Sequence, residues 1–125
     1  MATLITADTA PRFGQDGFSM VGLAAPSRGC ATVSTWRITA QPGAQSPTHR
    51  LTSDEVFVLL AGELTATVDG AEMTVRAGDS LSVPPGVDFS LANRGAAPFE
   101  AVACMAAGGM ALVGDGAPFP PPWAV

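Results

Sequence analysis

The chain consists of short segments rich in Val, Thr, Leu and Phe, separated by turn residues at near-regular intervals. The turn signals fall at residues 26–29, 42–43, 69–70, 77–79, 84–86 and 93–95. Short strands with this spacing predict an all-β sandwich or barrel. No segment sustains a 3.6-residue apolar period, so we expect at most one turn of helix, between residues 101 and 112.

Eight segments have the composition of β-strands. They are residues 18–22, 31–40, 55–61, 63–68, 72–76, 80–83, 87–92 and 99–105. The third is apolar at nearly every position, which indicates a strand covered on both faces. The fourth alternates apolar and polar residues and joins the fifth through Asp69-Gly70, a dipeptide typical of a type I′ hairpin. A proline-rich tail over residues 118–123 favours an extended conformation, which would let Phe119 and Trp123 pack on the barrel or on a partner subunit.

Composition narrows the classes of function. The 125 residues fit one domain, and 47% hydrophobic against 14% charged residues argues against disorder. All six basic residues are arginines, so lysine Schiff-base chemistry and a Walker-type lysine are excluded. The single histidine, His49, excludes a three-histidine zinc site within one chain. With a net charge of −5 and no basic stripe, we expect no nucleic-acid partner.

The N-terminal segment has no basic region followed by a long apolar stretch, so it does not resemble a signal peptide. Apolar runs such as residues 56–61 are too short to span a bilayer. We expect a cytoplasmic protein with no membrane partner. Cys30 and Cys104 lie far apart and outside any C-x-x-C motif, which favours two free thiols, with a disulfide as the alternative.

Two spaced motifs lie between Gly43 and Asn93. The first is Gly43, five residues, His49-Arg50-Leu51, three residues, Glu55, six residues and Gly62. The second is Gly78, five residues, Pro84-Pro85-Gly86, two residues, Phe89, three residues and Asn93. This pair of motifs resembles those of the cupin family. The resemblance implies a small jelly-roll barrel with an internal ligand pocket, usually in a homodimer. It predicts one cupin domain over residues 1–125, with a core of about 31–105 and both terminal segments packed on it.

In that family, the first motif supplies two histidines and a glutamate to a metal site, and the second supplies a third histidine. Here His49 and Glu55 match two of those ligands, whereas Leu51 and Phe89 occupy the other two positions and cannot coordinate a metal. We therefore expect no metal cofactor. The alternative is one divalent transition metal held by His49 and Glu55 and completed by water or substrate.

Three interpretations of His49 and Glu55 stay open. The two side chains could form a hydrogen-bonded acid–base dyad that acts on an organic ligand. They could form the weak metal site, or they could be two buried polar groups with no further role.

Residue alternation along the third strand places Glu55, Phe57 and Leu59 on one face. They would line the pocket beside Leu51 and Phe89. Trp36 and Met105, on neighbouring strands, are further candidates for the lining, although the sequence leaves their directions open.

We therefore expect a barrel that binds a small, partly apolar organic molecule. Metal-independent proton transfer by His49 and Glu55, as in an isomerase, cyclase or lyase, would fit that pocket. The alternatives are a metal-dependent enzyme such as a dioxygenase and a non-catalytic sensor or storage module. A homodimer is expected from the resemblance and from the doubly apolar strand over residues 56–61.

Overall fold

The computed structural model describes all 125 residues and contains eleven β-strands and two short 3-10 helices. The strands are β1 (Arg12–Gln15), β2 (Phe18–Gly22), β3 (Val33–Ala40), β4 (Arg50–Leu51), β5 (Glu55–Ala61), β6 (Glu63–Val68), β7 (Ala71–Arg76), β8 (Ser80–Val83), β9 (Phe89–Ala92), β10 (Phe99–Ala106) and β11 (Ala111–Leu112). The helices are η1 (Pro26–Arg28) and η2 (Pro122–Ala124). Both helices are single turns, and none of the chain's helices could cross a membrane.

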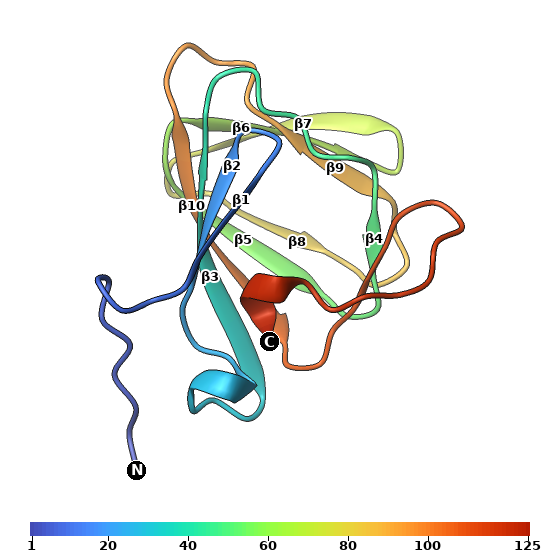
Figure 1. Ribbon diagram of the computed structural model, residues 1–125. Coiled ribbons are helices and arrows are strands. Elements are labelled where there is room, and N and C mark those ends of the chain that lie inside the picture. Colours follow the sequence, from blue (N-terminus) through green and yellow to red (C-terminus); the bar gives the residue numbers. More distant parts are fainter.

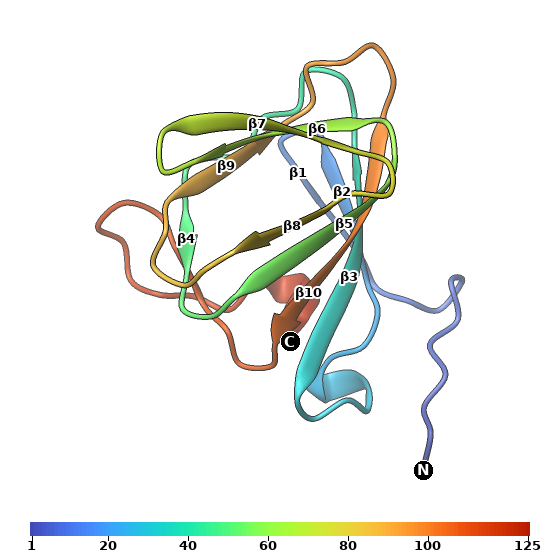
Figure 2. The same ribbon diagram turned by 180° about the vertical axis from the view of Figure 1, so that it is seen from behind.

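The strands form two main antiparallel sheets. The larger sheet has the order β1-β2-β3-β10-β5-β8 and the smaller has the order β7-β6-β9, while β11 pairs with β4. Figures 1 and 2 show the two sheets facing each other, with β4 and the C-terminal segment beside the opening between them. The expected all-β jelly-roll barrel is confirmed.

The strands missing from the sequence prediction are short. β1 contains a glycine and borders the large sheet, and β4 and β11 have two residues each, so none carries a readable alternation. The turn of helix allowed between residues 101 and 112 is absent. Instead β10 continues to Ala106 because it is paired along its length with β3 on one side and β5 on the other. Tertiary pairing therefore decides the conformation of this alanine-rich segment.

Alternation along the central strands builds the core. On β10 the residues Phe99, Ala101, Ala103 and Met105 are buried, and the residues between them lie on the outer surface or near it. Strand β5 buries its inner face in the same way, but Val58 and Leu60 on its outer face remain 40% and 47% exposed. Nothing within one chain covers that face, so the homodimer expected from this strand stays a prediction.

Two glycines at positive φ differ in the space available for a β-carbon. Gly70 (φ 82°) follows Asp69 (φ 50°) in the β6–β7 hairpin, as a type I′ turn requires, and a β-carbon added there would meet nothing within 4 Å. Gly62 (φ 75°) links β5 to β6, and a β-carbon there would lie 2.6 Å from the Pro98 carbonyl oxygen and 2.8 Å from the Phe99 α-carbon.

We expect Gly70→Ala to cost about 1–2 kcal/mol of unfolding free energy, which is the strain of a left-handed alanine. Gly62→Ala carries the same strain and must also displace backbone atoms of residues 98 and 99, so its cost should be clearly larger. Urea unfolding of the two variants measures the difference. Equal losses would contradict this account of the β5–β6 turn.

Candidate functional site

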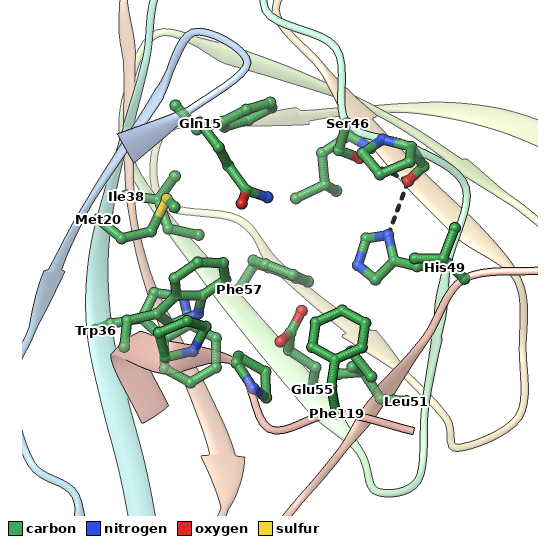
Figure 3. Close-up of a pocket in the computed structure, with 18 residues that line it drawn as sticks. Gln15, Met20, Trp36, Ile38, Ser46, His49, Leu51, Glu55, Phe57 and Phe119 are labelled. Atoms are coloured by element: carbon green, nitrogen blue, oxygen red, sulfur yellow. Dashed lines mark hydrogen bonds between the residues drawn. The ribbon is translucent and has the colours of Figure 1, made fainter. Parts of the chain in front are cut away.

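A cavity of about 260 Å³ lies inside the barrel beside the C-terminal segment, and 11 of its 18 lining residues are hydrophobic. Strands β2 and β3 supply the first wall, with Met20, Trp36 and Ile38. Strands β4 and β5 supply the second, with Leu51, Glu55 and Phe57. Figure 3 shows that the side chains of Gln15, His49 and Glu55 point into the space between these walls. The cavity is thus apolar with a few convergent polar groups, as small-molecule sites are.

Five of the eight residues singled out in the sequence line this cavity. They are Trp36, His49, Leu51, Glu55 and Phe57.

The other three, Leu59, Phe89 and Met105, belong to the packed core and are at most 3% exposed. Leu59 follows Phe57 by two residues along β5, beyond the end of the cavity. Phe89 packs on His49 and Phe57, with ring centroids 4.3 Å and 6.1 Å apart. Met105 packs closely against Gly109. Alternation gave the correct inward face for Leu59, the motif placed Phe89, and the sequence left the direction of Met105 open. None of these patterns tells how far the cavity extends.

Glu55 is buried on the inner face of β5, and its carboxyl group has no hydrogen bond or ion pair with another residue. Burial disfavours the charged form and raises the pKa of Glu55 to about 8. The group is therefore a neutral carboxylic acid at pH 7. The carboxyl group points into the cavity (Figure 3), where its O–H can donate a hydrogen bond.

His49 precedes β4 and is held by a hydrogen bond between its Nδ1 and the Pro47 carbonyl oxygen, 2.9 Å apart. Burial lowers the pKa of His49, an effect only partly opposed by that hydrogen bond and by the charge of Asp88. Because a carbonyl oxygen can only accept, the neutral ring carries its proton on Nδ1 and leaves Nε2 as an acceptor. Figure 3 shows that second nitrogen facing the cavity.

No hydrogen bond joins His49 to Glu55, so the dyad considered from the sequence is not formed as a direct pair. The two side chains are separate groups of opposite hydrogen-bonding character that face one cavity. A ligand would have to lie between them for both to act together.

The residues at the four cupin metal-ligand positions do not fit a three-histidine, one-glutamate site. Leu51 and Phe89 are 4% and 1% exposed hydrocarbon side chains that have no electron pair to donate. His49 and Glu55 provide two donors, and no cluster of three or more His, Cys, Asp or Glu side chains exists in the chain. We therefore derive no chemistry through a metal.

The C-terminal segment completes the cavity wall with Phe119, Pro121, Pro122 and Trp123. The Trp123 ring lies 6.5 Å from Trp36 and 6.3 Å from Phe13, measured between centroids. The sequence had left open whether this tail packs on the barrel or on a partner, and within this chain it packs on the barrel.

Side chains from distant parts of the sequence fasten this tail. The Arg28 guanidinium donates to the Trp123 carbonyl oxygen over 2.8 Å, and the buried Ser34 hydroxyl donates to the Ala124 carbonyl oxygen over 2.6 Å. Sequence reasoning missed these residues, and it missed Gln15 and Ser46 in the wall, because no local pattern marks a contact between segments so far apart.

The family model for the cupin domain matches residues 36–105, more than half of the chain. The chain belongs to the cupin family. Two solved structures show how widely this cupin's fold is shared. The polyketide cyclase RemF from Streptomyces resistomycificus has a TM-score of 0.74 and 12% identity, over 85% of this chain and 80% of that one. A sugar phosphate isomerase of the cupin superfamily from Silicibacter pomeroyi has a TM-score of 0.71 and 21% identity, over 90% of this chain and 82% of that one.

A sequence relative is longer than this cupin. The endoribonuclease YbeY of Myxococcus xanthus is 39% identical over 75 residues, which are 60% of this chain. The match spans 25% of the length of that relative. The likeness therefore concerns one part of the relative.

Proposed function

We propose that this cupin binds a compact, largely apolar organic molecule in the barrel cavity and catalyses a proton transfer on it without a metal. One observation carries the proposal: a buried proton donor, Glu55, and an unpaired acceptor, His49 Nε2, face the same apolar space with no bond between them. Such a pair supplies the two partners that general acid–base catalysis requires.

The reaction that fits is an isomerisation. His49 Nε2 takes a proton from one atom of the ligand, the electron pair shifts through the adjacent double bond, and Glu55 gives its proton to the atom at the other end. The ligand thus loses one proton and gains one. After the product leaves, the imidazolium releases its proton to water and the carboxylate takes one up from water, which restores both residues. The apolar walls strengthen both interactions because they exclude water.

The protonation states support these roles at neutral pH. The lowered pKa keeps His49 neutral and able to accept, and the raised pKa keeps Glu55 protonated and able to donate. A sugar phosphate isomerase and a polyketide cyclase share the fold, so an isomerisation is compatible with this barrel. The low identity means that the assignment rests on the site of this chain rather than on its neighbours.

Hydrogen–deuterium exchange into phenylacetone, a small ketone with acidic C–H bonds, tests the proposal. We expect the protein in D₂O to accelerate exchange, followed by NMR, and His49→Ala to lower the rate by about 100-fold or more. Gln45→Ala, an exposed neighbour outside the cavity, is the matched control and should leave the rate unchanged. A folded His49→Ala protein with the wild-type rate would refute a role for the imidazole.

Elemental analysis of untagged protein separates this proposal from a metal-dependent one. A stoichiometric transition metal that is lost in Glu55→Ala would favour a metal site completed by water or substrate. Tight binding of phenylacetone with no exchange would favour a sensor or storage role.

A further inference from the structure

The cavity contains no cation for an anionic ligand. His49 and Glu55 are the ionisable side chains in its wall, and no arginine lines it. All six arginines of the chain bind elsewhere. Arg37, Arg50, Arg76 and Arg94 pair with Glu100, Asp88, Glu63 and Glu72, while Arg12 and Arg28 donate to backbone carbonyl oxygens.

An anion placed in this cavity would be costly. A buried carboxylate or phosphate needs a charged partner or several N–H donors, because the apolar surroundings do not replace its hydration. The carboxyl group of Glu55 would stand beside it with no cation between them. A neutral oxygen acceptor, in contrast, could accept a hydrogen bond from the Glu55 carboxyl group, or from the nearby Gln15 amide, without bringing a charge into the cavity.

The rings of Trp36, Phe57 and Phe119 border the cavity. These flat apolar surfaces suit a planar ring, which they contact over a large area. A ligand with one oxygen at its edge could place that oxygen at Glu55 and its ring among the aromatic side chains (Figure 3).

We propose that the cavity selects an uncharged aromatic or alicyclic carbonyl compound, whose oxygen accepts a hydrogen bond from the Glu55 carboxyl group, and that it rejects carboxylates and phosphates. This inference rests on the proposed function only in requiring that the cavity binds a ligand. It names the class of that ligand. The raised pKa of Glu55, due to burial, agrees with the donor role at pH 7.

Four probes of similar size separate charge from shape: acetophenone, ethylbenzene, benzoate and phenyl phosphate. NMR titration follows binding directly, since the single His49 imidazole reports on the cavity through one set of ring resonances. At pH 7 we expect acetophenone to bind about tenfold more tightly than ethylbenzene, as one hydrogen bond to a buried donor provides. Benzoate and phenyl phosphate should bind at least about 100-fold more weakly than acetophenone.

Two variants assign the effect to Glu55. Glu55→Gln keeps a donor in the amide group and should retain the preference for acetophenone over ethylbenzene. Glu55→Leu removes the donor and should bind both probes equally. Ethylbenzene binding in both variants shows that the cavity is intact.

The outcomes distinguish this inference from the proposed function. Preferred binding of benzoate or phenyl phosphate, or equal binding of acetophenone and ethylbenzene by the wild type, would overturn the ligand class and leave the proton transfer open. Selective acetophenone binding with no exchange of phenylacetone would support the ligand class and overturn the catalytic proposal. Failure of all four probes to bind would overturn both.

Discussion

Raising the pH from 5 to 9 is expected to lower the unfolding free energy by about 4 kcal/mol through Glu55 alone. The pKa of this carboxyl group is about 8 in the folded chain and 4.5 as the ordinary value. Between these values the folded protein still holds a proton that the unfolded chain has released. Stability therefore falls as the pH rises from about 4.5 to about 8 and is constant above that range.

His49 contributes with the opposite sign. Burial lowers its pKa from 6.5, so below pH 6.5 the unfolded chain binds more protons than the folded chain. The contribution of His49 to stability therefore rises with pH and is complete near pH 6.5. The interval from pH 7 to pH 8 therefore shows the loss of stability due to Glu55 with the least contribution from His49.

Glu55→Gln is the matched variant because it removes the titration and keeps the shape of the side chain. The difference in unfolding free energy between wild type and variant, measured in urea from pH 5 to pH 9, isolates Glu55 from every other group. We expect the unfolding free energy of the variant, relative to that of the wild type, to increase as the pH rises to about 8. A difference that does not change with pH would show that Glu55 is not buried in the way described.

Phe57→Ala is expected to destabilise the fold by about 3–5 kcal/mol. The side chain is 1% exposed, forms one wall of the cavity and meets the Phe89 ring at 6.1 Å in an edge contact. Its loss removes buried apolar area and enlarges a cavity that the two rigid sheets cannot collapse to fill.

Val58→Ala is the control on the same strand. Val58 follows Phe57, points to the outer face and is 40% exposed. The substitution should cost less than about 1 kcal/mol in the monomer. Thermal or urea unfolding at pH 6.5 compares the two variants. A loss at Val58 as large as that at Phe57 would indicate that the outer face is covered, as the expected homodimer would require.

The sequence predicted the central strands well because their side chains alternate. Strands β5, β6 and β8 begin and end where the pattern placed them, and the Asp69-Gly70 hairpin has the positive φ angles of a type I′ turn. It also predicted that Glu55 and Phe57 share an inward face. These are local properties, since the direction of a side chain follows from its position along one strand.

Local patterns could not show how far the cavity extends. Leu59 and Phe89 point inward as expected, and so does Met105, whose direction the sequence left open. Other side chains pack around all three, and the cavity stops short of them. Trp123 and Phe119 reach the wall because Arg28 and Ser34, far away in the sequence, hold the tail against the barrel. Such contacts depend on where separate segments meet.

The sequence by itself determined that this protein is a β-barrel of the cupin type, and that two of the four metal-ligand positions carry hydrocarbon side chains. Only the tertiary structure decided the orientation and protonation state of His49 and Glu55, which occupy the other two positions. His49 is turned by the Pro47 carbonyl so that Nε2 faces the cavity, and Glu55 is buried without a partner. The physical reason is that desolvation is the main influence on the protonation state of both groups, and their burial arises from the packing of segments that the sequence keeps apart, although the hydrogen bond of His49 to Pro47 is local.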